Sequence, residues 1–206
     1  MHPNPVYHTA DPARNIAWAR DRGFGILAVG GADAPPMLSH VPFLLDAEGV
    51  AADLHLVRSN PIARALTKGP LPARLAVSGP DSYVSPDWYG IDDQVPTWNY
   101  VAVHLTGRLE LLPQDTLRDL LDRQSAFYES RLAPKPAWTA DKMEAEALAK
   151  LMRMIVPARM VVDTVDGTWK LGQNKTDEVR QQAAGHMEAY GFGSEHRILS
   201  ALMRGA

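Results

Sequence analysis

Residues 51–61 read AADLHLVRSNP, and this stretch decides the fold class. Its leucines fall on one face of an extended chain and its histidine and valine on the other, which predicts a strand over 51–58. Asn60 is a good helix N-cap, and Pro61 suits the first helical position. The stretch therefore predicts a strand that runs directly into a short helix ending near residue 68.

More strands are expected on both sides of this junction. Turn-bounded extended segments follow one another, mostly without a helix between them, and this favours antiparallel pairing over a parallel α/β sheet. The predicted strands are 24–30, 37–45, 51–58, 71–78, 98–112 and 159–165. The sequence therefore predicts a mainly β, α+β fold built on a small antiparallel barrel.

Helices are predicted before and after these strands. Capping residues and apolar spacing indicate helices over 12–22, 60–68, 113–131, 139–155, 175–190 and 194–203. Thr139 would cap one of them and Pro157 would end it. Residues 80–97 are expected to form a long functional loop. Turns are expected at 31–36 and 166–167, with a short extended piece at 169–171.

Length and composition fit a globular domain. The chain has 206 residues, 46% of them hydrophobic, and a net charge of −3. We expect a single domain over 1–206, with a helical insertion over about 113–155 and C-terminal helices over about 175–204. The small acidic excess argues against a broad electrostatic footprint on DNA. Without a signal peptide or a bilayer-spanning stretch, we expect a cytoplasmic protein with no membrane partner.

The strand-to-helix junction is the first candidate binding site. Arg58 can form charge-assisted hydrogen bonds, Ser59 offers a hydroxyl, and Asn60 begins a helix whose N-terminus favours anions. Arg64 lies one turn further along. These residues together favour a phosphate group. A plain Asn-Pro helix cap with surface arginines fits the same pattern and stays open.

Two strand segments carry further polar and aromatic side chains. Residues 95–100, VPTWNY, place Trp98 and Asn99 at the mouth of a strand. The indole there would border a flat ligand or simply fill the core. Ser39 and His40 interrupt an apolar strand, and each needs a hydrogen-bonding partner if it is buried.

A second helix start combines two carboxamides with an ammonium group. Gln173, Asn174 and Lys175 follow one another there, and helix capping is the alternative role for this group.

Familiar catalytic and metal motifs are absent from the sequence. It contains no HExxH, GxSxG, GxGxxG or P-loop pattern, and no cysteine. Seven histidines raise a metal or haem hypothesis, but a hydrogen-bonded structural role is favoured for each. We therefore expect no metal site and assign no catalytic acid, base or nucleophile.

Five segments together resemble a known family. They are SHVPF (39–43), LVRSNP (56–61), GPDSYVSP (79–86), VPTWNY (95–100) and KLGQNK (170–175). They occur in this order in PaiB-type proteins, which are bacterial FMN-binding negative transcriptional regulators. The resemblance extends over nearly the whole chain, from Val6 to about Leu202.

The resemblance implies a split β-barrel of the FMN-binding type, related to pyridoxamine-phosphate oxidase and flavin reductases. It also implies a homodimer with FMN in a cleft between the subunits. DNA as a partner follows from the family label alone. The cofactor-binding residues would be Ser39, His40 and Val41 through their backbone, Arg58, Ser59, Asn60 and Arg64 at the phosphate, and Trp98, Asn99, Gln173, Asn174 and Lys175 around the ring, some of them from the partner chain.

The flavin itself carries the electron transfer in such proteins, so redox activity needs no dedicated catalytic side chain. Lys175, beside two amides, would stabilise the reduced flavin from the pyrimidine edge. Two alternatives stay open. One is a flavin-dependent oxidoreductase or flavin reductase with no role on DNA. The other is a haem-binding split-barrel protein.

Overall fold

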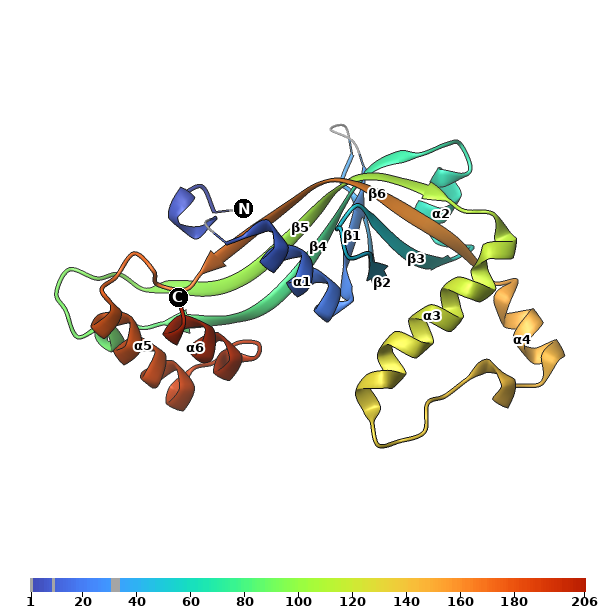
Figure 1. Ribbon diagram of the computed structural model, residues 1–206. Helices are drawn as coiled ribbons and strands as arrows, with labels where there is room; N and C mark the ends of the chain where they lie inside the picture. The colour runs from blue at the N-terminus through green and yellow to red at the C-terminus, as the bar shows by residue number, and fades with distance from the viewer. Residues whose placement is uncertain (1, 9, 31–33) are drawn as a thin grey trace. The chain divides into compact units, whose positions relative to one another are not determined.

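The computed structural model describes residues 2–8, 10–30 and 34–206. Within these ranges six strands close a barrel in the order β1-β2-β3-β6-β5-β4 (Figure 1). The strands are β1 (Phe24–Val29), β2 (Met37–Leu45), β3 (Ala51–Val57), β4 (Leu71–Val84), β5 (Thr97–Leu111) and β6 (Ile155–Lys170). The predicted α+β barrel is confirmed.

Helices cap and connect the strands. They are α1 (Pro12–Arg22), α2 (Pro61–Leu66), α3 (Leu117–Glu129), α4 (Ala145–Met152), α5 (Asp177–Tyr190) and α6 (His196–Arg204). Short 3-10 turns occupy Pro5–Tyr7, Pro86–Tyr89, Gln114–Thr116, Ser130–Leu132 and Ala140–Lys142. No helix in the described ranges is both long and apolar enough to span a membrane.

Strand pairing follows the alternation of buried and exposed side chains. β1 pairs antiparallel with β2 and β4, and β3 pairs antiparallel with β2 and β6. β1 alternates strictly between inward and outward residues, as a strand with one buried face should. The inward side chains fill the barrel, and the largest fully buried ones include Leu27, Phe43, Leu54, Leu75, Leu105 and Met160.

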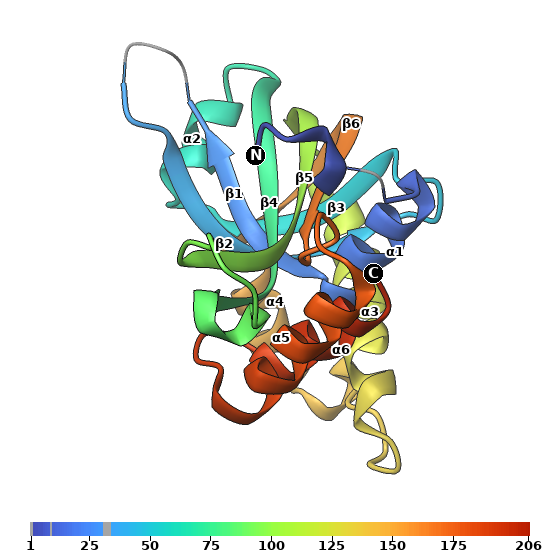
Figure 2. The same cartoon turned by 90° about the vertical axis from the view of Figure 1, so that its left-hand side faces the viewer.

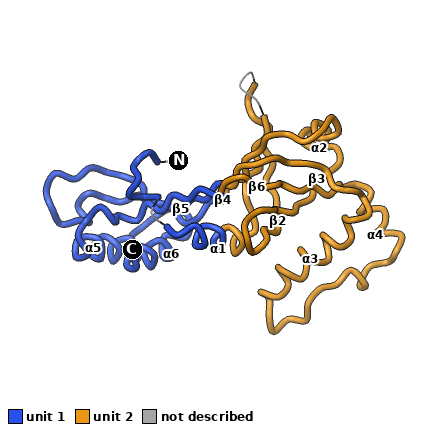
Figure 3. Tube along the Cα trace, turned by 45° about the horizontal axis from the view of Figure 1, so that its top comes forward, with its two compact units in different colours: residues 1–18, 77–104, 165–206 blue, residues 19–76, 105–164 orange. Residues whose placement is uncertain are grey.

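The chain divides into two compact units, and β4, β5 and β6 each contribute residues to both (Figure 3). The barrel unit consists of residues 19–76 and 105–164. The other unit, here the terminal unit, consists of residues 1–18, 77–104 and 165–206. The single domain expected over 1–206 stays a prediction.

The terminal unit has a hydrophobic core of its own. α5 and α6 lie side by side in it (Figure 2). Their apolar faces cover aromatic and aliphatic residues from the ends of the long strands. The buried members of this core are Val84, Tyr89, Val101, Trp169, Leu171, Ala183, Ala184, Met187, Leu199 and Met203.

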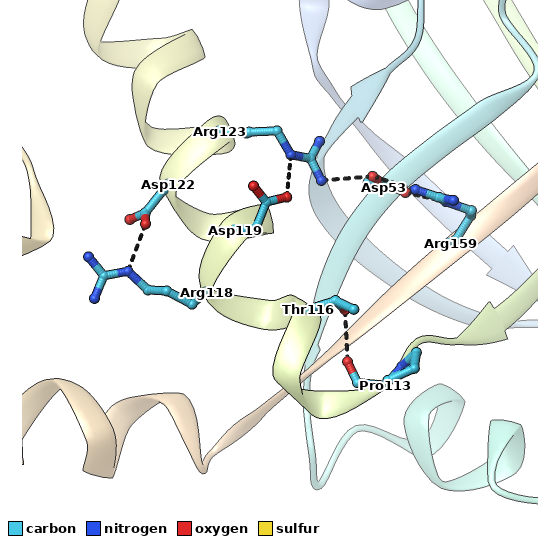
Figure 4. A network of polar contacts seen from close by, with 8 residues as sticks. All are labelled: Asp53, Pro113, Thr116, Arg118, Asp119, Asp122, Arg123 and Arg159. Atoms are coloured by element: carbon cyan, nitrogen blue, oxygen red, sulfur yellow. Dashed lines mark hydrogen bonds and ion pairs between the residues drawn. The ribbon is translucent and has the colours of Figure 1, made fainter.

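A carboxylate between two arginines joins α3 to the barrel wall (Figure 4). Asp53 of β3 is 6% exposed and accepts bidentate hydrogen bonds from the guanidinium group of Arg159 on β6, at 2.6 and 3.0 Å. Arg123 of α3 reaches the same carboxylate at 3.1 Å and Asp119 at 2.7 Å. The arrangement fixes α3 against two strands through one buried acid.

Two strands are longer than expected. β4 continues to Val84, so the first third of the expected loop over 80–97 is strand. Gly79 suits this strand because a Cβ there would lie 2.8 Å from side-chain atoms of Trp18 and Val101. The glycine before the proline thus serves close packing inside a strand and does not end it.

β6 runs unbroken from Ile155 to Lys170, so the predicted helix end at Pro157 and the turn at 166–167 are both wrong. Pro157 stands within the strand, opposite His55 of β3. Gly167 also lies within the strand. Only glycine fits at this position, because a Cβ there would lie 2.0 Å from the side-chain oxygen of Asn15. The glycine again marks a close approach.

The helix predicted over 139–155 is much shorter in the structure. α4 covers Ala145–Met152 only, with Glu144 at its N-cap position, and Thr139 makes no capping hydrogen bond. Pairing of residue 155 with β3 draws the following residues into the barrel. Part of the turn expected at 31–36 lies outside the described residues.

Candidate functional site

The junction between β3 and α2 forms as the sequence predicts. Asn60 caps α2, with its Oδ1 accepting the N–H of Ile62 at 2.9 Å. Its Nδ2 donates to Oγ of Ser39 on β2 at 3.2 Å. Two of the predicted residues are therefore in direct contact, and one side chain ties β2 to the start of α2.

The start of α2 has few backbone donors left for an anion. Pro61 has no N–H, the N–H of Ile62 is bonded to Asn60, and the N–H of Arg64 is bonded to the carbonyl of Asn60 at 3.0 Å. Positive charge at this corner must therefore come from side chains.

Three arginines supply that charge. A cavity of about 430 Å³ beside α2 is lined by Val57, Arg58, Ser59, Arg64, Arg153 and Met154, here called the arginine corner. None of the three guanidinium groups forms an ion pair with a carboxylate of the described residues. Guanidinium groups that share a cavity repel one another, so an anionic group there would lower the electrostatic free energy.

The predicted residues on β2 face different ways. The side chain of Val41 is 2% exposed inside the barrel, so only its backbone is open to contact. His40 points outward, with its ring centroid 6.4 Å from that of Phe24 in a stacked arrangement. Neither side chain lines the arginine corner.

A second cavity, of about 350 Å³, lies in the terminal unit. It is lined by Tyr7, Tyr89, Asp93, Gln94, Val95, Thr97, Asn99, Lys170, Gly172, Asn174 and Lys175, here called the lysine cavity. Three predicted residues, Asn99, Asn174 and Lys175, come together here. Asn99 is 1% exposed, and its Nδ2 has only the sulfur of Met203, at 3.5 Å, as acceptor. Its amide oxygen accepts no hydrogen bond from the residues described.

Two ammonium groups enter this cavity without a carboxylate partner among the described residues. Lys175 donates to the side-chain oxygen of Gln94, with its Nζ 5.3 Å from the ring centroid of Tyr89. Lys170 donates to the hydroxyl of Thr97. Burial lowers the pKa of Lys170 and raises that of Tyr89. The cavity therefore offers hydrogen-bond donors and positive charge to an electron-rich ligand edge.

Gln173 and Trp98 do not line the lysine cavity. Gln173 closes the turn after β6, because its Oε1 accepts the N–H of Leu171 at 2.8 Å and its Nε2 donates to the carbonyl of Trp169. Trp98 alternates with Asn99 on β5 and so faces the opposite side. It is 45% exposed and makes edge-to-face contacts with Tyr83 and Phe192.

Sequence reasoning missed two cations that the structure brings to these cavities. Lys170 lies in the stretch KLGQNK, but its direction follows from the full length of β6, which the local sequence does not indicate. The helix predicted over 139–155 would include Arg153, whereas in the structure Arg153 ends α4 beside Arg58. The positions of both residues depend on how β6 pairs in the barrel, and the local sequence around each residue does not reveal that pairing.

Comparison with known proteins identifies the family. Residues 1–164 match the sequence model described as "Putative FMN-binding domain". The chain belongs to this FMN-binding family. Its cofactor is therefore FMN. Lys170 and the residues of α5 and α6 lie beyond the matched part.

A curated relative supports the PaiB-type resemblance. The chain is 33% identical over 99 residues to a PaiB protein of Bacillus subtilis (strain 168), the protease synthase and sporulation protein PAI 2. The matched stretch covers 48% of this chain and 46% of that protein, so just under half of the relative's length is matched.

Solved structures support the fold. The FAD and haem binding protein from Mycobacterium smegmatis superposes with a TM-score of 0.55 at 19% identity, covering 90% of this chain and 80% of that one. The conserved hypothetical protein Rv2991 from Mycobacterium tuberculosis gives a TM-score of 0.58 at 14% identity, covering 85% and 94%. The split-barrel prediction is confirmed.

Proposed function

We propose that this protein is a PaiB-like homodimer that holds FMN between its protomers and has flavin-dependent redox capacity. The arginine corner would receive the phosphate, and the lysine cavity would receive the pyrimidine edge of the ring. When bound, FMN supplies the electron-transfer chemistry. The chain's own side chains bind and orient it.

The unpaired amide oxygen of Asn99 is the observation that carries this proposal. Asn99 lines the cavity and its amide oxygen has no donor among the described residues, so the cavity suits a ligand that presents an N–H. The pyrimidine edge of a flavin has one N–H between two carbonyl groups. Asn99 would accept from the N–H, while Lys170 and Lys175 would donate to the carbonyl oxygens. Donors and acceptors of the cavity thus complement this edge.

The arginine corner fits the other end of FMN. A phosphate monoester carries close to two negative charges at neutral pH. Arg64 and Arg153 have no acidic partner among the described residues, and Ser59 adds a hydroxyl. Guanidinium groups bind phosphate through parallel hydrogen bonds. The exposed side chains of Val57 and Met154 would cover apolar parts of the ligand beside them.

The regulatory role is the part of this proposal that rests on family resemblance. The C-terminal helices give it little electrostatic support, because two of their three arginines, Arg180 and Arg204, are engaged within the protein. Arg180 is buried and bonds to Asp177 at 2.9 Å, and Arg204 bonds to Glu188 at 2.6 Å. A flavin oxidoreductase without a role on DNA is thus the second candidate. Salt-dependent binding to a promoter fragment, absent with unrelated DNA, would favour the regulator.

Freshly purified protein tests the main proposal. We expect a yellow protein that absorbs at about 450 nm, releases FMN on denaturation and contains one FMN per chain. Apo-protein should recover the same spectrum on addition of FMN. Colourless protein that fails to bind added FMN would contradict the proposal. A Soret band on haem titration, with no flavin binding, would favour the haem alternative.

A further inference from the structure

We infer that Arg153, together with Arg64, is a direct ligand of the flavin phosphate, and that Arg58 is a positioning residue that holds Arg153 in place. The inference deepens the proposed function and rests on it. It assigns phosphate binding to Arg153, which lies in the helical insertion. It also changes the role of Arg58 from phosphate ligand to positioning residue.

The hydrogen bonds of Arg58 show why it is not free to serve the phosphate with its whole guanidinium group. Its Nε donates to the carbonyl of Arg153 at 3.0 Å, and its Nη2 donates to Gln114 Oε1 at 3.0 Å and to the carbonyl of Ile155 at 3.3 Å. Three of its five N–H donors are thereby committed to the protein.

Arg58 also forms a backbone hydrogen bond to the segment that contains Arg153. The N–H of Arg58 donates to the carbonyl of Met154 at 2.8 Å. Gln114 adds bonds to the carbonyls of Met152 and Ile155, at 3.4 and 3.2 Å. The connection between α4 and β6 is therefore held at every residue from 152 to 155. Arg153 lies in the middle of this held segment, so its position depends on Arg58.

Arg64 and Arg153 differ from Arg58 in having uncommitted guanidinium groups. No hydrogen bond or ion pair from either side chain reaches another described residue, although both line the arginine corner. Arg64 comes from α2 and Arg153 from the end of α4, so the two line the corner from separate elements. Such a pair suits a phosphate dianion, which has acceptor oxygens on several sides.

Comparing FMN with riboflavin isolates the phosphate, because the two molecules differ only in that group. Apo-protein would be titrated with each flavin, and binding followed by quenching of flavin fluorescence. Arg153→Gln should weaken FMN binding about 10- to 100-fold and leave riboflavin binding unchanged. Arg108→Gln is the matched control, since Arg108 is an exposed barrel arginine whose side chain bonds, among the described residues, only to the carbonyl of Pro70.

The outcomes separate this inference from the proposed function. Wild-type protein that binds neither flavin would end both. Wild-type protein that binds FMN, with an Arg153→Gln variant whose preference for FMN over riboflavin is unchanged, would overturn the inference alone. Equal losses for both flavins would also overturn it, because they would indicate a disturbed fold and not a lost phosphate contact.

A double-mutant cycle tests the role of Arg58. If Arg58 acts through Arg153, then Arg58→Gln should weaken FMN binding alone but add little to the Arg153→Gln variant. Losses that multiply would make Arg58 a phosphate ligand in its own right and overturn the positioning role. Should Arg58→Gln fail to fold, Arg58→Lys keeps the charge but loses the forked bonds, and the same cycle applies.

Discussion

Lys175 and Lys170 bring two ammonium groups into one cavity, and their charge should influence the electron affinity of a bound flavin. Reduction adds negative charge to the ring, so a nearby cation favours the reduced form. We therefore expect Lys175→Ala to lower the flavin midpoint potential. For a two-electron couple, each tenfold loss of preference for the reduced form corresponds to about 30 mV.

Redox titration with a reference dye measures this shift. Lys150→Ala is a suitable control, because Lys150 lies on α4 and is not among the residues that line the lysine cavity. An unchanged potential in the Lys175 variant, with FMN still bound, would remove Lys175 from the pyrimidine edge. A lower potential in both variants would indicate a long-range charge effect.

At the same scale, three residues singled out from the sequence line the lysine cavity together. Asn99, Asn174 and Lys175 come from two distant segments, each recognised by its polar residues beside apolar ones, and the fold brings them together. Trp98 does not line this cavity, for a simple geometric reason. Neighbouring residues of a strand point to opposite faces, so Trp98 and Asn99 cannot serve one cavity together. The residue types indicate that this segment carries polar contacts, whereas the two-residue repeat of the strand determines which side chain faces the cavity.

Among the elements, α3 depends most visibly on a single buried group. Burial alone would raise the pKa of Asp53, but hydrogen bonds and charge from Arg159 and Arg123 outweigh it and lower that pKa below its ordinary value of 3.8. The carboxylate therefore stabilises the fold fully above pH 3.8. This contribution is lost as pH falls through the lower folded value.

Asp53→Asn should remove this contribution and leave two arginines without their shared carboxylate, since an amide has one acceptor oxygen and no charge. We expect a loss of about 1–3 kcal/mol in the free energy of unfolding at neutral pH, since the arginines are partly exposed and screened. Urea unfolding at pH 7 and at about pH 3 measures it, and the difference between variant and wild type should shrink at the lower pH. Asp122→Asn is the control, because its pair with Arg118 lies on the outer surface of α3.

A loss in Asp122→Asn as large as that in Asp53→Asn would contradict a special role for the buried acid. So would a difference that persists unchanged at low pH, because the contribution in the wild type should weaken as pH falls from 3.8 toward the lowered pKa of Asp53.

Element lengths also show where local sequence signals fail. Strand starts and most helices follow from capping residues and alternation, as α1, β2 and α5 illustrate. β4 and β6 run past the glycine and proline signals that would end an isolated strand. Gly79 and Gly167 sit where a Cβ would collide with side chains from distant parts of the chain. The need for a small residue there is tertiary, so it cannot be distinguished from a turn signal locally.

For the whole molecule, the proposed dimer would hold two flavins, each in a site between the two protomers. The arginine corner belongs to the barrel unit and the lysine cavity to the terminal unit. Our proposal of FMN between protomers implies that one chain supplies the phosphate contacts and its partner supplies the ring contacts. Size-exclusion chromatography with light scattering should then report about twice the 22.6 kDa of one chain.

Mixed dimers decide whether the contacts are shared in this way. One chain would carry Arg64→Gln with Arg153→Gln, and the other Lys170→Ala with Lys175→Ala, each with its own affinity tag. As homodimers, both variants should lose FMN. In a mixed dimer purified on both tags, sharing between protomers places all defects in one site and none in the other. We therefore expect about one FMN per mixed dimer by absorbance. If one chain supplied both sets of contacts, every site would carry a defect, and the mixed dimer would be as colourless as its parents.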